Sequence, residues 1–307
     1  MKILIVASFN KGRFAPFILE QADALKKIGC EIDFFGLQGK GLQGYLKNLP
    51  SLRRKIKALH PDVVHAHYGL SGLFANLQRH VPVVTTYHGS DINICKVFRF
   101  SKLAMRLSAW NIFVSKKTLA IAKPKKNYSL LPCGIDFSEL QQTEKLQARQ
   151  RMGLRTDKKY ILFAGAFDNE VKNAPLAKES VASLHDENFE LLELKGYTRE
   201  EVTLLMCAAD VFLMTSFTEG SPQVIKEALA CGLPIVSVDV GDVQELVGGV
   251  EGCYIVERTP DSIALSIKQA SAFSGKTQGR EVIVEKKLVN DYIAREILKV
   301  YRRVSNE

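Results

Sequence analysis

Short apolar segments rich in β-branched residues alternate with amphipathic helical patterns along most of the chain, and this rhythm constrains the fold more than any other feature. A short apolar run favours a strand, whereas apolar residues that recur with a period of about 3.6 favour a helix. Strands that alternate with helices predict a parallel sheet with helices on both faces. In the first half of the chain we expect strands at residues 2–7, 31–37, 62–67 and 82–87, with helices at 15–28, 45–59 and 71–79 between them.

A polar, charged stretch at residues 141–159 interrupts the rhythm, which then starts again. The segment 159–165 repeats the basic-then-apolar pattern of residues 1–7. This restart predicts two Rossmann-like, doubly wound parallel-sheet domains in tandem, at residues 1–145 and 146–307. Further strands are expected at 190–195, 210–215 and 233–238, and an amphipathic helix at 281–303 is expected to pack back on the first domain.

Composition fits this two-domain prediction. The 307 residues are 46% hydrophobic and 24% charged, which is typical of a globular protein with sizeable cores. The opening apolar run, residues 3–7, is much shorter than a signal-peptide core or a membrane span. The six cysteines are scattered and none forms a C-x-x-C pair, so we expect buried thiols in a reducing compartment. These features predict a cytoplasmic protein.

The formal charge is +9, from 42 basic and 33 acidic residues. Such an excess suggests nucleic acid, an anionic membrane surface or phosphorylated ligands as partners. No basic run is interleaved with aromatic residues, and the basic cluster at residues 123–126 is short. We therefore expect no nucleic-acid partner.

The most informative segment runs from an apolar strand at 210–216 through a loop at 217–223 into a helix at 224–231. Ser221 suits the N-cap and Pro222 suits the first helical position. Backbone N–H groups at such a helix start can bind an anionic phosphate. The N–H groups expected to point outward belong to Gln223, Val224 and Ile225.

Two carboxylates flank this helix start, Glu219 before it and Glu227 within the helix. Both can face the same crevice, and a carboxylate can accept two hydrogen bonds from the cis-diol of a ribose. In the other interpretation Glu219 only complements the helix dipole and Glu227 lies on a solvated helix face. The largely apolar neighbours of Glu227 argue against a solvated helix face for this residue.

The order Glu219-Gly-Ser-Pro, then Glu227-Ala-Leu-Ala-Cys-Gly-Leu-Pro, resembles the E-x7-E signature of glycosyltransferase family 4. Those enzymes are retaining and have two Rossmann domains in the arrangement called GT-B. The segments 61–67, 82–91 and 131–136 are similar to motifs of the family's first domain. The resemblance covers nearly the whole chain.

The resemblance implies a role for several residues. Glu219 would contact the transferred sugar, Glu227 the ribose, Lys172 the diphosphate, and His88 would lie near the donor sugar and the acceptor. The expected reaction transfers a sugar from a nucleoside-diphosphate sugar in a cleft between the domains, with no metal ion and no cofactor. The remaining donor-binding residues would be Gly12, Gly220, Ser221, Pro222, Gln223, Val224 and Ile225.

The chain also departs from the family pattern. Ala166 stands where relatives usually carry an arginine, so one of two cations expected at the diphosphate is missing. Either Lys11 or Arg13 supplies that charge, or both are ordinary exposed loop residues. The run 195–197 falls where a nucleotide base usually packs. His65 and His67 share a strand face, but no third ligand with suitable spacing predicts a metal site, and we expect them to be structural.

The acceptor is expected to be a glycan or a lipid-linked molecule, as in polysaccharide biosynthesis. Basic and aromatic residues suggest a patch suited to a lipid-phosphate surface, although a solvated helix face explains them equally well. The protein would then lie peripherally on the inner face of an anionic membrane. Two other functions stay open, a nucleotide-sugar 2-epimerase and a non-catalytic sugar-nucleotide-binding subunit. The patch residues are Lys96, Phe98, Arg99, Phe100, Lys102 and Arg106.

Overall fold

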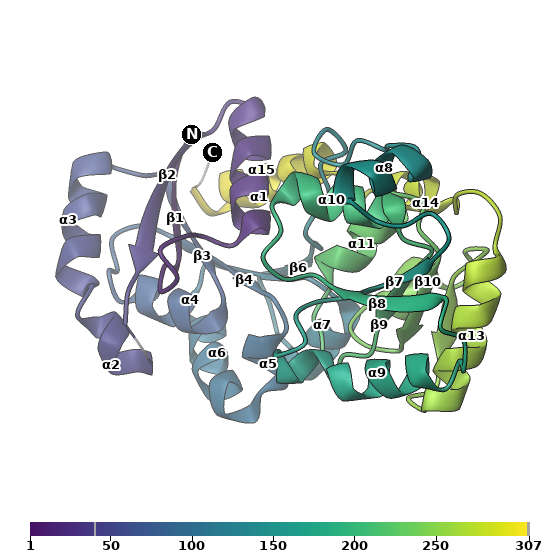
Figure 1. Cartoon of the computed structure of the whole chain (residues 1–307). Coiled ribbons are helices and arrows are strands. Elements are labelled where there is room, and N and C mark those ends of the chain that lie inside the picture. Colours follow the sequence, from purple (N-terminus) through teal and green to yellow (C-terminus); the bar gives the residue numbers. More distant parts are fainter. Residues whose placement is uncertain (40, 306–307) are drawn as a thin grey trace. The chain divides into compact units, whose positions relative to one another are not determined.

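The computed structural model describes residues 1–39 and 41–305. The chain forms two compact units (Figure 1). The first contains residues 1–134 together with the chain from residue 290 onward, and the second contains residues 135–289. Each unit is built on its own parallel sheet, which confirms the prediction of two Rossmann-like domains.

The first unit has a six-stranded sheet in the order β2-β1-β3-β4-β5-β6, with every neighbouring pair parallel. Strand β2 matches its predicted bounds, β1 ends one residue later than predicted, and β3 and β4 each begin one residue later than predicted, which is the usual uncertainty of element ends. The strands are β1 (Lys2–Ser8), β2 (Glu31–Leu37), β3 (Val63–His67), β4 (Val83–Tyr87), β5 (Trp110–Phe113) and β6 (Tyr128–Leu130). The helices are α1 (Pro16–Lys27), α2 (Gly41–Leu46), α3 (Leu49–Leu59), α4 (Gly69–Asn76), α5 (Ser90–Asn93), α6 (Cys95–Leu107), α7 (Lys116–Ala122) and α15 (Asn290–Ser305).

The C-terminal helix α15 belongs to the first unit, as expected, and lies beside α1 (Figure 1). Its apolar stripe joins the core beneath the sheet through Ile293, Ile297 and Tyr301. The expected single helix 281–303 is wrong in one respect, because the segment forms two helices. Lys287, with a φ of 57°, lies just after the end of α14 (Gly279–Glu285), which stays with the second unit.

The second unit has a five-stranded parallel sheet in the order β11-β10-β9-β7-β8. Residues 135–145, which the prediction assigns to the first domain, fall within this unit, where Ile135 and Leu140 pack against Ala230. The strands are β7 (Lys159–Phe163), β8 (Phe189–Glu193), β9 (Val211–Met214), β10 (Ile235–Val238) and β11 (Tyr254–Val256). The remaining helices are α8 (Lys145–Met152), η1 (Glu170–Lys172), α9 (Ala174–Ala182), α10 (Arg199–Ala208), α11 (Gln223–Ala230), α12 (Val243–Val247) and α13 (Pro260–Ala272).

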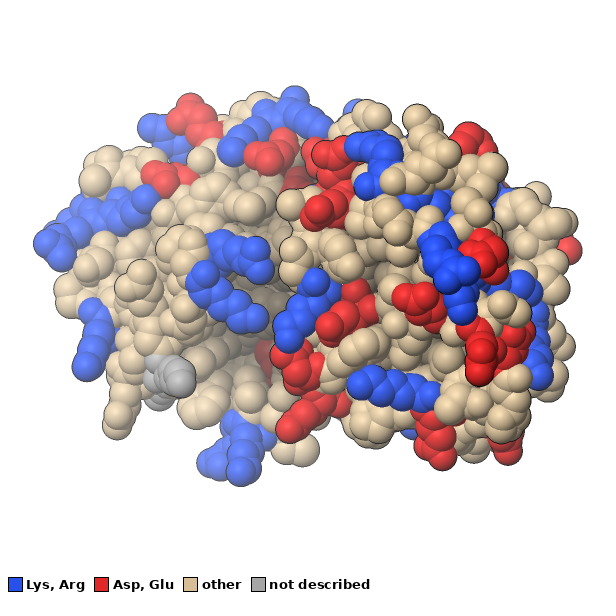
Figure 2. Space-filling model, viewed as in Figure 1, with Lys and Arg blue, Asp and Glu red and all other residues tan. Residues whose placement is uncertain are grey.

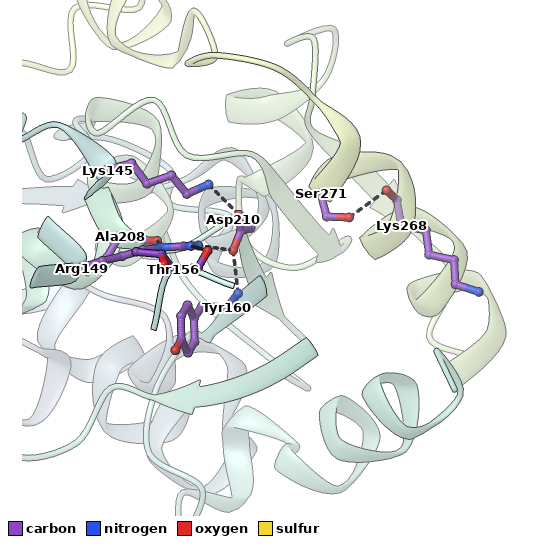
Figure 3. A network of polar contacts seen from close by, with 8 residues as sticks. All are labelled: Lys145, Arg149, Thr156, Tyr160, Ala208, Asp210, Lys268 and Ser271. Atoms are coloured by element: carbon purple, nitrogen blue, oxygen red, sulfur yellow. Dashed lines mark hydrogen bonds and ion pairs between the residues drawn. The ribbon is translucent and has the colours of Figure 1, made fainter. Parts of the chain in front are cut away.

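A buried ionic network fixes the starts of β7 and β9 (Figure 3). The guanidinium of Arg149 donates to Asp210 Oδ2 at 2.8 Å and to the carbonyl of Ala208 at 3.0 Å. Asp210 also accepts from the backbone N–H of Tyr160 at 2.6 Å and from Lys145 Nζ at 2.6 Å. Because each buried charge has partners, the network is not left with an unpaired ion. It sets the register of the two strands whose opposite ends carry the candidate site.

None of the helices in residues 1–39 and 41–305 combines the length and the apolar character that crossing a membrane would require. The cysteines of this part of the chain are all free thiols, and four of the six are buried.

Candidate functional site

In the second unit the candidate site lies where β7, β9 and β10 end. These neighbouring strands are parallel, so the loops that follow them leave the same edge of the sheet. Ligands of open parallel sheets bind at this edge. The loop after β7 leads through η1 to Lys172, and the loop after β9 leads through Glu219 into α11.

Lys172 and Glu219 form an ion pair, with Lys172 Nζ 2.8 Å from Glu219 Oε1. Both side chains are more than four-fifths buried. The lysine stem crosses Gly165, where a Cβ would lie only 2.9 Å from Lys172 Cγ. The hydroxyl of Thr215 donates to the carbonyls of Lys172 and Asn173 at 2.9 and 3.0 Å, which ties the two loops together. The structure thus places these two predicted site residues in direct contact.

The start of α11 differs from its predicted form. The helix begins at Gln223 with Pro222 as the N-cap, and no side chain caps it. Ser221 is not the cap, because its hydroxyl donates to Asp242 Oδ2 at 2.6 Å. The N–H of Ile225 was expected to point outward. It donates instead to the carbonyl of Pro222 at 3.2 Å, within the first turn of the helix.

A buried charged cluster lies behind this turn, and the sequence interpretation missed it. Lys226 is fully buried in α11, and its Nζ donates to Gln223 Oε1 at 2.9 Å. Burial raises the pKa of Asp242, while Lys226 and Ser221 oppose that rise. A lysine directly before Glu227 in an apolar helix was the available signal.

The loop after β10 reaches the same turn through a glycine. Gly241 has a φ of +56°, and a Cβ there would lie 2.7 Å from the carbonyl oxygen of Gly220. A side chain at position 241 would therefore push the loop away from the segment Glu219–Ser221. Glycine suits both the left-handed backbone conformation and the close approach.

Glu227, the predicted ribose ligand, is 6% exposed and is ion-paired with Arg199. Arg199 is the first residue of α10, whose start is fixed by a capping box between Thr198 and Glu201. This arginine orients the carboxylate and neutralises its charge. The sequence interpretation missed Arg199, because only the folded chain brings the start of α10 to the middle of α11.

The loop after β7 contains Ala166 and no arginine in the family position. The next residue, Phe167, is held by its N–H, which donates to Glu193 Oε2 at 2.7 Å. Close by, Lys195 Nζ lies 2.6 Å from Asp168 Oδ2, and this pairing raises the pKa of Lys195 and lowers that of Asp168. Tyr197, expected near the base, is 42% exposed.

In the first unit, the motif that begins at His88 is a turn built around Asp91. The N–H groups of His88 and Gly89 donate to Asp91 Oδ1 at 3.0 and 2.9 Å, and that of Gly69 donates to Oδ2 at 2.9 Å. Burial raises the pKa of Asp91 to about 6, although these N–H bonds oppose the rise. The carboxylate thereby fixes the backbone that carries His88.

The His88 ring sits between the rings of Phe17 and Tyr68, with both centroids 4.7 Å away. His88 Nε2 lies 3.0 Å from Nδ1 of His67, and its Nδ1 lies 3.8 Å from the Cys133 sulfur. The ring is therefore held on several sides. Gly12, the other predicted donor-binding residue of this unit, lies exposed in the loop after β1 with Lys11 and Arg13 on either side.

His65 and His67 are fully buried and stack on each other. His65 lies 2.5 Å from the Tyr301 hydroxyl and 2.7 Å from that of Thr86. Burial lowers the pKa of His65 well below its usual value and that of His67 to about 3, so both rings are neutral. Within the described residues, no group of three His, Cys, Asp or Glu side chains is placed to hold a metal ion.

Comparison with known proteins gives two family matches. The model of Glycosyltransferase Family 4 matches residues 16–139, and that of Glycosyl transferases group 1 matches residues 158–272. The chain is 29% identical over 242 residues to the putative teichuronic acid biosynthesis glycosyltransferase TuaC of Bacillus subtilis (strain 168). That alignment covers 69% of this chain and 62% of TuaC, so the chain matches less than two thirds of this relative.

Two solved structures share the fold. Sucrose-phosphate synthase from Thermosynechococcus elongatus superposes with a TM-score of 0.81 at 16% identity, over 99% of this chain and 98% of that one. HepE of Anabaena, solved in complex with UDP, superposes with a TM-score of 0.75 at 16% identity, over 97% of this chain and 99% of that one. Both domains, the E-x7-E segment and the two family matches agree, and the chain belongs to glycosyltransferase family 4.

Proposed function

We propose that this protein is a retaining glycosyltransferase that moves a sugar from a nucleoside-diphosphate sugar to a hydroxyl group of a glycan or lipid-linked acceptor. The observation that carries the proposal is the contact between Lys172 and Glu219 at the edge of the second sheet, beside the start of α11. A cation, a carboxylate and a helix N-terminus together suit a sugar diphosphate. The complex of the structural neighbour HepE with UDP supports a uridine nucleotide as the first donor to test.

In the proposed complex the diphosphate lies at the start of α11 and takes Lys172 as its counter-ion. Glu219, which pairs with that lysine in the structure, turns to a hydroxyl of the transferred sugar. Glu227 holds the ribose cis-diol while Arg199 keeps the carboxylate oriented. Gly220, Ser221, Pro222 and Val224 line the donor through their backbone. His88 and Gly12 are proposed to contact the donor from the first unit.

The chemical step breaks the bond between the anomeric carbon and the diphosphate oxygen. Negative charge then grows on the diphosphate, where Lys172 and the helix start stabilise it. The acceptor oxygen attacks the anomeric carbon on the face that the diphosphate leaves, and the acceptor proton passes to a phosphate oxygen. The configuration of the sugar is retained. We propose that no metal ion or cofactor takes part, because this cationic edge supplies the positive field itself.

The test is a panel of uridine, guanosine and adenosine diphosphate sugars, each incubated with and without polyprenyl-phosphate-linked and free glycan acceptors. The proposal expects a product whose new linkage has the anomeric configuration of the donor, determined by NMR, and activity that survives EDTA. A 2-epimerised donor in the absence of acceptor would identify an epimerase instead. Binding of nucleotide with no turnover for any acceptor would favour a non-catalytic subunit.

A further inference from the structure

The net positive charge of the chain comes from one segment. Between Asp91 and Asp136 there is no acidic residue, and this segment contains nine lysines and arginines. The remaining chain contains 33 basic and 33 acidic residues, so the whole excess of +9 belongs to residues 92–135. This segment folds into α6, α7, strand β5 and the edge strand β6 of the first unit. None of the residues assigned to the sugar donor is part of it.

Part of this charge converges on a pocket of about 540 Å³. Lys102 and Arg106 line it from α6, and Lys123, Lys125 and Lys126 line it from the loop between α7 and β6. No acidic side chain lines it; its other polar side chains belong to Ser108, Asn111 and Asn127. Within the described residues, none of the five cations is paired with a carboxylate. Five unneutralised cations around one pocket attract a multivalent anion.

An exposed apolar row runs beside the pocket along α6. Phe100, Leu103 and Leu107 follow the spacing of one helix face and are each between 38% and 45% exposed. Figure 2 shows Lys and Arg side chains over α6, at the lower edge of the face drawn. Ile121 and Tyr128, on either side of the basic loop, are also exposed. Basic and apolar residues on one exposed surface are typical of helices that lie in a membrane interface.

The opposite face of α6 is fixed in the unit, so the apolar row is not a packing surface of the same unit. Ser101 and Ala104 are fully buried. Ser101 packs so closely on α4 that a Cβ at Gly69 would lie 2.0 Å from its hydroxyl oxygen. Because Ser101 and Ala104 face the unit, α6 presents its basic and apolar residues outward.

We propose that this basic pocket and the apolar row of α6 together dock the first unit on an anionic membrane, with a lipid phosphate headgroup in the pocket. A soluble anion would match the cations but would leave Leu103 and Leu107 in water. Nucleic acid would favour exposed aromatic rings for stacking, whereas this row is mainly aliphatic. The membrane surface satisfies both the charge and the apolar side chains. This inference extends the proposed function, since it places the enzyme where a lipid-linked acceptor lies, but it does not depend on the sugar donor.

The experiment measures sedimentation of the full chain with vesicles of phosphatidylcholine alone and of phosphatidylcholine with about one third phosphatidylglycerol. We expect binding only to the anionic vesicles, and weaker binding at high salt. The combined variant Lys123→Gln, Lys125→Gln, Lys126→Gln should weaken binding by roughly a hundredfold, because each basic residue near an anionic surface contributes about fivefold. Its matched control, Lys57→Gln, Lys268→Gln, Lys286→Gln, changes the net charge equally at exposed sites and should bind as wild type.

A second variant, Leu103→Ser with Leu107→Ser, tests the membrane as the source of the phosphate. It should weaken vesicle binding by about tenfold or more at unchanged charge, with the fold checked by circular dichroism. Wild-type binding by this variant would overturn the proposal, as would equal losses in the pocket variant and its control.

Displacement of the protein from vesicles by millimolar inorganic phosphate would also contradict the proposal and would assign the pocket to a soluble anion. If the wild type bound single-stranded RNA but no vesicles, and the variant with Lys123, Lys125 and Lys126 replaced lost that RNA binding, the pocket would be assigned to nucleic acid and the proposal would be overturned. Because vesicles contain no sugar nucleotide, these outcomes are separate from a failure of the transferase assay.

Discussion

Lys172 and Glu219 lie 47 residues apart in sequence and neutralise each other at the edge of the second sheet. The pair orients a lysine in a largely buried place, where an isolated ion would be costly. With Ala166 in the position of a second cation, the diphosphate would depend on this one lysine and the helix start. Arg199 plays a comparable part for Glu227. Single substitutions should therefore separate the roles of the two carboxylates.

Lys172→Ala should lower kcat by roughly 10²–10³, the usual effect of losing one preorganised group that stabilises developing charge. Steady-state kinetics with the best donor and acceptor measure the change. Lys268→Ala, at an exposed position of α13, is the control and should have wild-type kinetics. A Lys172→Ala enzyme within about threefold of wild type would remove this lysine from the mechanism.

Glu227→Gln should weaken binding of the nucleoside diphosphate by about one to two decades, because hydrogen bonds to a charged group contribute roughly 1.5–3 kcal/mol. Wild-type protein should discriminate against the 2′-deoxy nucleotide by a similar factor. Glu219→Gln should reduce turnover more than nucleotide affinity, since Glu219 is proposed to contact the reacting sugar. Calorimetric titration of both nucleotides against both variants measures this division, with the exposed Glu281→Gln as control. Equal wild-type affinity for the two nucleotides would refute the ribose assignment.

At the scale of single elements, the functional side chains depend on turns at strand ends. The turn after β4 is held by three N–H bonds to one buried carboxylate, Asp91, and it carries His88. The turn before α11 is held by Ser221 and Asp242, and by the close contact of Gly241. In both cases a buried acid organises backbone that would otherwise be a mobile loop.

The Asp91 turn makes the stability of the first unit depend on pH. Its pKa of about 6 lies above the usual value of 3.8, so the unfolded chain releases this proton at a lower pH than the folded chain does. The contribution of Asp91 to the free energy of unfolding is therefore full below about pH 4 and is lost as pH rises through about 6. The neutral, buried His65 and His67 act in the opposite direction over this window, because their lowered pKa values make the folded state more stable as pH rises. The contribution of Asp91 is therefore measured as a difference: the urea-unfolding free energy of the wild type minus that of Asp91→Asn should fall by about 3 kcal/mol at most between pH 4 and pH 7. An equal pH dependence in both proteins would contradict the shift.

At the scale of the whole molecule, the chain is divided so that its last helix stabilises its first unit. Helix α15 supplies five residues to the buried core beneath the first sheet, and its Tyr301 hydroxyl is a partner of His65. The second unit contributes its own sheet and every residue of the Lys172, Glu219 and Glu227 cluster. The last helix thus stabilises the first unit, although it follows the second unit in the sequence.

Deletion of residues 290–307 should unfold the first unit and leave the second folded. Burial of each large apolar side chain contributes roughly 1.5–3 kcal/mol, so losing Ile293, Ile297, Val300 and Tyr301 removes an amount comparable with the stability of a domain. Limited proteolysis with mass spectrometry should show cleavage within residues 1–134 and a protected fragment that begins near residue 135. Tyr301→Phe is the milder comparison and should cost about 1–3 kcal/mol by leaving Nδ1 of His65 without its partner. A protected first unit after the deletion would show that α15 is dispensable.

Local patterns in the sequence were sufficient for the architecture. The alternation of strand and helix patterns predicts two parallel sheets. The spacing of apolar residues over a short stretch is enough to distinguish a strand from a helix and to show which face of each is buried. The E-x7-E segment likewise identifies the edge at which Glu219 and Glu227 lie, since a helix start and its carboxylates are neighbours in sequence. Its resemblance to family 4 is confirmed by the two family matches.

Only the tertiary structure decided which distant groups meet. Arg199 reaches Glu227, Asp242 takes the Ser221 hydroxyl that was expected to cap α11, and Lys226 is buried rather than solvated. The tertiary structure also breaks the predicted 281–303 helix and assigns its two parts to different units. Such contacts depend on the path of the chain between residues far apart in sequence, and on which buried charge finds a partner. Neither is encoded in the local periodicity from which the elements were predicted.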